Sequence, residues 1–79
     1  MTYESFSFIE EGIVYCRVKE IKKDKIVLET DKIKEFDKEF WNEEIKEGDY
    51  VRVYIKNNRI IYLEKIDKEF FEKIKELIQ

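Results

Sequence analysis

The sequence predicts a small, mainly β domain (α+β): an SH3-like or OB-like antiparallel barrel of about five strands with a C-terminal α-helix packed on one side. Three observations lead to this prediction: alternating apolar runs, short polar turns between them, and an amphipathic segment at the end of the chain. A chain of 79 residues has room for one domain, 1–79, which buries about 60 to 65% of its unfolded surface.

A first hairpin is predicted between residues 13 and 30. The stretch IVYCRVKEI, residues 13–21, alternates, with Val14, Cys16 and Val18 on one face and Tyr15, Arg17 and Lys19 on the other. A polar turn, KKD, separates it from the β-rich run KIVLET, residues 25–30. We expect the two runs to pair.

Residues 1–12 are expected to form an N-terminal strand or extension. YESFSFI alternates and would place Phe6 and Phe8 on one face, with the chain turning back at Glu11 and Gly12. The opening has no basic n-region followed by an apolar run, so it does not fit a signal peptide. Cys16 is the only cysteine, which excludes an intramolecular disulfide and fits a reducing compartment, so a cytoplasmic location is expected.

Residues 31–47 are compatible with a strand or with a helix. The apolar residues Ile33, Phe36, Phe40, Trp41 and Ile45 would also suit one helical face. We favour a short strand from Ile33 to Phe36 followed by a single helical turn, because Asp37 is a good N-cap and helix-forming residues follow it.

Residues 48–67, GDYVRVYIKNNRIIYLEKID, read as two strands around a turn at Asn57 and Asn58. Asparagine tolerates the positive φ of a two-residue turn. That turn would place Ile55 opposite Ile60, Val53 opposite Tyr62, Tyr54 beside Ile61 and Arg52 beside Leu63, which makes both faces apolar.

A loop with an odd number of residues gives a different hairpin. Its core face would be continuous, and the opposite face would gather Tyr50, Arg52, Tyr54 and Tyr62 as an exposed binding surface. The asparagine pair favours the even register. In that register Tyr54, Ile61 and Leu63 are expected to lie under the C-terminal helix.

The C-terminal helix, residues 67–79, is the clearest single element. Asp67 is its predicted N-cap. One stripe carries the apolar residues Phe70, Phe71, Ile74, Leu77 and Ile78.

The residue content argues against an enzyme. Histidine is absent, which excludes imidazole catalysis, Ser-His and Cys-His nucleophile systems and histidine-bound zinc. Cys16 shares a strand face with two valines and is expected to be a buried, structural thiol. No phosphate-binding glycine loop or calcium loop is present. We expect no catalytic residue, cofactor or metal.

Charge bears on the class of partner. The net charge is −3 with both signs interspersed, so nothing draws the chain toward nucleic acid or anionic membrane. Two basic clusters, KEIKKDK (19–25) and KNNR (56–59), nevertheless lie at predicted hairpin tips, where small barrels often hold single-stranded nucleic acid. The candidate ligand-binding residues are Tyr50, Arg52, Tyr54, Arg59, Trp41 and Arg17.

Three stretches together resemble a family of small bacterial and archaeal domains of unknown function: KKDKIVLET, FDKEFWNEEIKEGDYV and DKEFFEKIKELI. The resemblance covers residues 13–79, with Leu28-Glu29 and Glu47-Gly48-Asp49 fitting best. The chain departs from it at Trp41-Asn42, where the family tends to have Leu-Pro, and in residues 1–12. Lys-Glu-Gly-Asp before a strand also occurs in ribosomal-S1-type and SH3-like barrels. The resemblance implies a fold and no activity.

The sequence therefore favours a non-catalytic binding module for a protein partner, through the edge strand of residues 3–9 or the Trp41 region. The runner-up is a single-stranded nucleic-acid-binding barrel, and a third hypothesis is a small inhibitor encoded by a mobile genetic element. The partner and the oligomeric state are not encoded in these patterns.

Overall fold

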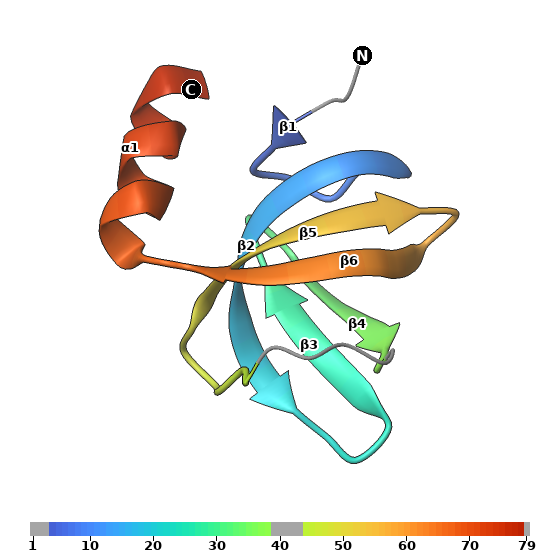
Figure 1. The fold of residues 1–79 in the computed structure, drawn as a ribbon. Coiled ribbons are helices and arrows are strands. Elements are labelled where there is room, and N and C mark those ends of the chain that lie inside the picture. The colour runs from blue at the N-terminus through green and yellow to red at the C-terminus, as the bar shows by residue number, and fades with distance from the viewer. Residues whose placement is uncertain (1–3, 39–43, 79) are drawn as a thin grey trace.

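The computed structural model describes residues 4–38 and 44–78. These residues form one antiparallel sheet, extended by a short parallel strand, and one helix (Figure 1). The strands are β1 (Glu4–Ser5), β2 (Glu11–Ile21), β3 (Lys25–Glu29), β4 (Ile33–Asp37), β5 (Tyr50–Lys56) and β6 (Arg59–Ile66), and the helix is α1 (Lys68–Ile78). The prediction of a mainly β domain with a C-terminal helix is confirmed.

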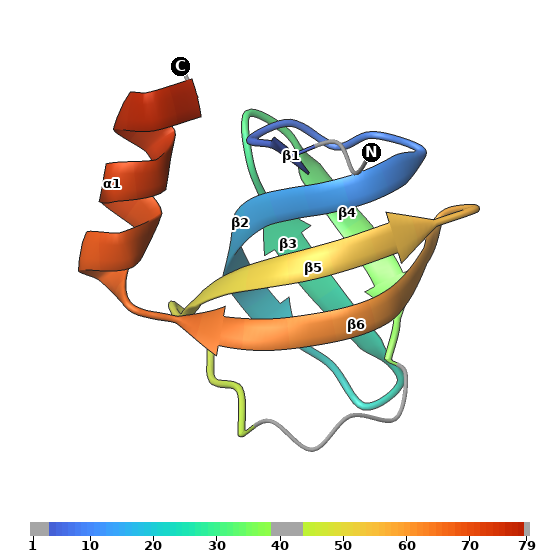
Figure 2. The ribbon, with the colours of Figure 1, turned by 45° about the horizontal axis from the view of Figure 1, so that its top comes forward.

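The strand order is β4-β3-β2-β5-β6, with β1 pairing in parallel with β2. The long strand β2 belongs to both halves of the sheet: residues 11–17 pair with β5, and residues 17–21 pair with β3 (Figure 2). Within the described residues β4 and β6 are not paired with each other, so the barrel is not closed. The SH3-like or OB-like assignment therefore stays a prediction.

The inner core is the set of buried apolar side chains on the concave side of the sheet. β2, β3, β4, β5 and β6 all contribute, because strands turn every second side chain inward, except where β6 skips one residue. Its members are Val14, Cys16, Val18, Ile26, Leu28, Phe36, Val51, Val53, Ile55, Ile60 and Leu63. The predicted burial of Cys16 is confirmed.

The β5–β6 hairpin combines the two predicted registers. Asn57 and Asn58 both have positive φ, 54° and 62°, and the two-residue turn pairs Ile55 with Ile60 as expected. The register then shifts by one residue at a β-bulge, because Ile61 has no direct partner.

Beyond the bulge the predicted pairing is wrong. Val53 pairs with Leu63 instead of Tyr62, and Arg52 pairs with Glu64 instead of Leu63. Leu63 consequently enters the inner core, and it does not lie under the helix. The bulge thus lets a tight asparagine turn coexist with a continuous apolar face.

The N-terminal segment also differs from the prediction. Only Glu4 and Ser5 form a strand, and the chain has already turned back before Glu11, where β2 begins. Phe6 and Phe8 do not share a face. Phe6 packs outside the sheet against Tyr15, whereas Phe8 packs against the inner core, with its ring 5.7 Å from that of Phe36.

In residues 31–47, which were compatible with a strand or a helix, the predicted strand from Ile33 to Phe36 is confirmed as β4. Asp37, the predicted N-cap, ends this strand, and its carboxylate pairs with Lys25. Residues 39–43, with Trp41 and most of the predicted helical turn, lie outside the described residues.

A tight turn at Gly48 and Asp49 leads into β5. Gly48 has φ 92°, which favours glycine, and its N–H donates to the Val18 carbonyl at 2.7 Å. The Asp49 carboxylate accepts from the Lys46 N–H at 2.8 Å, which closes the turn.

Helix α1 follows β6 directly and stands against the outside of the sheet at one end (Figure 1). Asp67 immediately precedes it, and its carbonyl accepts from the Phe71 N–H at 2.9 Å. Phe71 and Ile74 pack on the sheet, whereas Phe70 is 40% exposed and Leu77 is 82% exposed. The helix therefore covers a smaller area than the predicted stripe suggested, because only part of that stripe faces the sheet.

Among the described residues, no helix is long and apolar enough to cross a membrane.

Candidate functional site

The outer face is the convex side of β2, β5 and β6, opposite the inner core. The alternation of β5 places Tyr50, Arg52 and Tyr54 on it, since Val51, Val53 and Ile55 point inward. Their cross-strand partners on β2 are Arg17, Tyr15 and Ile13. The structure thus brings four predicted site residues, Arg17, Tyr50, Arg52 and Tyr54, onto one face.

A chain of hydrogen bonds crosses the middle of this face. The Tyr15 hydroxyl donates to Glu4 Oε1 at 2.5 Å, and the Arg52 guanidinium donates to Tyr15. Arg52 Nη2 also donates to Glu64 Oε2 at 2.7 Å, and this same oxygen accepts from the Tyr62 hydroxyl at 2.9 Å. This series of hydrogen bonds links β1, β2, β5 and β6.

The same contacts set the ionisation of these groups. The hydrogen bond from Arg52, followed by that from Tyr62, lowers the pKa of Glu64, and Glu64 in turn raises the pKa of Arg52. Burial is the main cause that raises the pKa of Tyr15, with the Glu4 carboxylate adding to it and Arg52 opposing it. The positive charge of Arg52 is therefore already balanced within the protein.

Aromatic rings fill the end of the outer face beside the helix. Phe6 stacks on Tyr15 at 5.1 Å between ring centroids, and Phe71 of the helix contacts Phe6 at 5.2 Å and Tyr50 at 4.6 Å. With Ile66 and Ile74 these rings make a small outer cluster. Tyr50 is consequently half covered by the helix and is not an open stacking surface.

A cleft of about 300 Å³ remains beside these rings, and we call it the aromatic cleft. It brings together residues from the segment after β1, from β2, β3, β5 and α1, and from the β3–β4 turn. Its lining residues are Phe6, Ser7, Tyr15, Arg17, Glu29, Thr30, Asp31, Tyr50, Phe71 and Lys75.

The opposite end of the outer face is apolar and open. The β-bulge turns both Ile61 and Tyr62 out of the inner core, and they are 58% and 53% exposed. Tyr54 lies across from Tyr62 and is half-buried. The prediction that the helix covers Ile61 is wrong, since the helix packs at the far end of the face.

The remaining predicted site residues lie apart from this face or outside the described residues. Arg59 is exposed at the tip of the β5–β6 hairpin, opposite Lys56. Trp41 lies in the range 39–43, which the structure does not describe.

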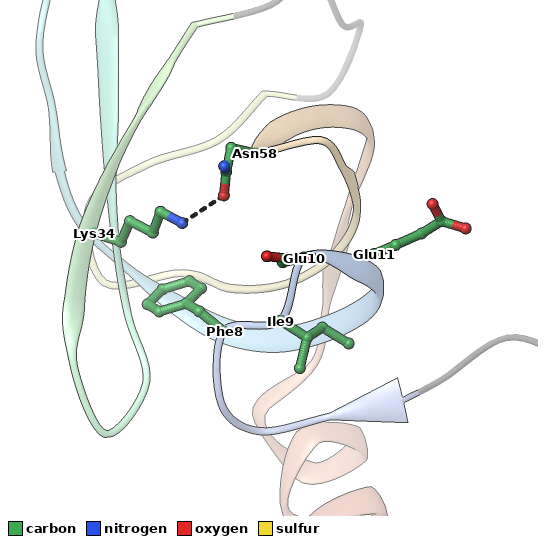
Figure 3. A pocket seen from close by; sticks show the side chains of 6 residues that line it. All are labelled: Phe8, Ile9, Glu10, Glu11, Lys34 and Asn58. Carbon is green, nitrogen blue, oxygen red and sulfur yellow. Dashed lines mark hydrogen bonds between the residues drawn. The ribbon is translucent and has the colours of Figure 1, made fainter.

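A wider cleft of about 640 Å³ lies where β4 approaches the tip of the β5–β6 hairpin (Figure 3). Phe8 and Ile9 form its apolar part, and Lys34 Nζ donates to Asn58 Oδ1 at 3.0 Å across it. Phe8 also packs on the core residue Phe36, so one side of this cleft is continuous with the inner core. We interpret the cleft as part of the fold.

Two of the four lysines in the first predicted basic cluster, residues 19–25, are paired with carboxylates. Lys22 Nζ lies 2.8 Å from Glu35 Oε2, and Lys25 pairs with Asp37. These pairs join the β2–β3 hairpin to β4 and leave less positive charge for a phosphate backbone. In the part of the chain that the structure describes, no group of three or more acidic or cysteine side chains is placed to hold a metal ion.

Sequence reasoning missed several residues of the face, above all Tyr15, Phe6 and Phe71. The alternation places Tyr15 on the face opposite Val14 and Cys16, with Arg17 and Lys19, yet Tyr15 is only 1% exposed, because Phe6 and the hydrogen bond to Glu4 cover it. The sequence did contain a signal for this second apolar cluster. Tyr15 lies on the outward face with Arg17, and phenylalanines such as Phe6 and Phe71 lie near both ends of the chain.

Comparison with known proteins found no matching family model, no matching curated protein and no matching solved structure. The resemblance to a family of unknown function therefore remains a prediction, and any function has to be argued from the outer face itself.

Proposed function

We propose that the protein is a non-catalytic binding module that recognises a protein partner through the outer face, in the cytoplasm. One observation carries this proposal. The outer face presents two exposed apolar side chains, Ile61 and Tyr62, and its arginine, Arg52, already has its charge balanced by Glu64. Protein interfaces place apolar and aromatic side chains at their centre and exclude unpaired charge from it. The open sheet, with β2 shared between its halves, supports the SH3-like or OB-like assignment as part of this proposal.

Single-stranded nucleic acid is the second candidate ligand. The β-bulge favours it in one respect, because Tyr50, Arg52, Tyr54 and Tyr62 share a face as a stacking surface would require. Two observations oppose it: the helix residue Phe71 covers part of the Tyr50 ring, and the charge of Arg52 is neutralised. Phosphate contacts need cations that are available to displace the counterions of the nucleic acid.

Affinity capture with matched variants tests the proposal. The parent protein and the Ile61→Asp variant are immobilised and exposed to nuclease-treated lysate of the source organism, and bound proteins are identified by mass spectrometry. Ile33→Asp is the control, since Ile33 is also an exposed isoleucine at 55%, but lies on β4. We expect a stoichiometric protein that binds the parent and the control and is lost with Ile61→Asp.

Two results would contradict the proposal. One is a partner that binds all three baits equally, because the outer face would then be irrelevant. The other is the absence of any specific protein after nuclease treatment when nucleic acid is recovered without nuclease. Circular dichroism on each variant establishes that it is folded before capture.

A further inference from the structure

Two cations line the aromatic cleft, and neither has a carboxylate partner among residues 4–38 and 44–78. In the described residues, Arg17 makes only a long hydrogen bond from Nε to the Gly48 carbonyl, at 3.4 Å, and Lys75 has no ion pair. Arg52, on the same face, is held by Glu64 at 2.7 Å. Arg17 comes from β2 and Lys75 from the last turns of the helix, so the fold brings together two charges that are far apart in sequence.

Two carboxylates line the same cleft. The Asp31 carboxylate accepts from the Thr30 hydroxyl at 2.9 Å and from Ser7, and these contacts lower its pKa. Glu29 lies directly across from Arg17 on the neighbouring strand. The lining therefore has two positive and two negative side chains, so its net charge is zero and it offers no overall attraction to a highly charged anion such as phosphate.

An acidic peptide matches this arrangement of charge and rings. Its carboxylate could approach the two cations, while its backbone N–H groups are donors for acidic oxygens such as those of Glu29. The half-buried rings of Tyr50 and Phe71 offer apolar surface for an aromatic or aliphatic side chain. A nucleotide would present a base to the same rings, but its phosphate brings no adjacent N–H donors.

We propose that the aromatic cleft binds an acidic segment of the protein partner, with an apolar side chain against Tyr50 and Phe71 and a neighbouring carboxylate between Arg17 and Lys75. This inference rests on the proposed function, because it names the chemistry that the partner presents to one end of the outer face.

An NMR titration with a small probe tests the inference without the partner. The probe is N-acetyl-L-phenylalanine, which joins a ring to a carboxylate, and its control is N-acetyl-L-phenylalaninamide, which lacks only the charge. In ¹H–¹⁵N spectra we expect the acid to shift the amides of Arg17, Tyr50, Phe71 and Lys75. The amide should bind about tenfold more weakly, as expected when a charged hydrogen bond is lost.

Charge-neutralising variants locate the contact. Arg17→Gln and Lys75→Gln should each weaken binding of the acid by about threefold to tenfold, and the double variant should abolish it. Both side chains are exposed, so the variants should fold. Lys73→Gln is the control, because Lys73 is exposed on the same helix and is not part of the lining.

Several results would overturn the inference: no shifts in the cleft, equal binding of acid and amide, full binding by the double variant, or tighter binding of adenosine monophosphate than of the acid. These outcomes are separate from the fate of the proposed function. Loss of partner capture with Ile61→Asp would still support a protein-binding outer face if the probe fails to bind.

Discussion

The two apolar regions of the molecule are built differently. In the part of the chain that the structure describes, the inner core joins eleven buried side chains from five strands, and none of them is polar apart from the thiol of Cys16. Among the same described residues, the outer cluster has three buried members, Phe6, Tyr15 and Ile66, and its other residues are half-exposed. Charged groups surround the outer cluster, with Arg52, Glu64 and Glu4 in hydrogen bonds beside it.

This difference in burial assigns stability mainly to the inner core and recognition mainly to the outer face. A small domain depends on every large apolar side chain that is fully removed from water, and the inner core supplies most of these. The outer cluster only partly excludes water, so its rings and charges remain accessible at the aromatic cleft. Changes in the inner core should therefore unfold the protein, whereas changes on the outer face should alter binding first.

Thiol labelling gives the largest expected difference between the two regions. In an Ile61→Cys variant, the new thiol should react rapidly and Cys16 should react at least about a thousandfold more slowly, because Cys16 becomes accessible only on unfolding. Burial also raises the pKa of the Cys16 thiol and suppresses the reactive thiolate. Mass spectrometry follows both rates in native buffer, and rapid modification of Cys16 would break the distinction.

Truncation of a core leucine should have the next largest effect. Leu28 is fully buried, so Leu28→Ala should reduce the free energy of unfolding by about 2 to 5 kcal/mol. Ile33→Ala on the adjacent strand β4 should change it by no more than about 0.5 kcal/mol, since Ile33 is exposed. Urea denaturation monitored by circular dichroism compares the two, and equal losses would contradict the assignment of the core.

Truncation on the helix should have an intermediate effect. Phe71→Ala removes ring contacts with Phe6 and Tyr50 and should cost about 2 kcal/mol, less than a fully buried phenylalanine. Phe70→Ala is the matched control and should melt close to the parent. The place of Phe70 in the apolar stripe had suggested that it contributes to stability, whereas the structure assigns that contribution to Phe71. A larger loss for Phe70 than for Phe71 would mean that the helix packs through a different side.

The ion pair on the outer face should have the smallest effect on stability. Because the pKa of Glu64 is lower in the folded state, its contribution is present above the unfolded value, about 4.3, and is lost as the pH falls through the lowered value. Glu64→Gln should reduce the free energy of unfolding at pH 7 by at most about 1 kcal/mol. The parent and the variant should converge as the pH falls below the lowered pKa of Glu64, and a constant difference would contradict this role.

The sequence contained the information for most strands, but not for the β-bulge. Val51, Val53 and Ile55 alternate strictly, whereas Ile60 to Leu63 is an unbroken apolar run. The two-residue turn and the alternation of β5 cannot both hold unless one residue of β6 is skipped. Each predicted register satisfied one requirement, and the structure satisfies both by leaving Ile61 unpaired.

The candidate site was less predictable because it depends on contacts between distant segments. Alternation correctly placed Tyr50, Arg52 and Tyr54 together, but it could not show that Glu64 neutralises Arg52 or that Phe71 covers Tyr50. The prediction for the N-terminal strand was wrong for a related reason. Its parallel pairing with β2 is a long-range choice that local alternation does not encode.

Fluorescence anisotropy with labelled single-stranded DNA and RNA over a salt series tests most directly whether the outer face serves proteins or nucleic acid. Because Arg52 is bound to Glu64, we expect no measurable affinity at about 150 mM salt, for the parent or for an Arg52→Ala, Arg59→Ala double variant. Micromolar binding by the parent that weakens with salt and disappears in the double variant would contradict the account. It would show that Tyr50, Arg52 and Tyr54 bind nucleic acid despite the internal ion pair.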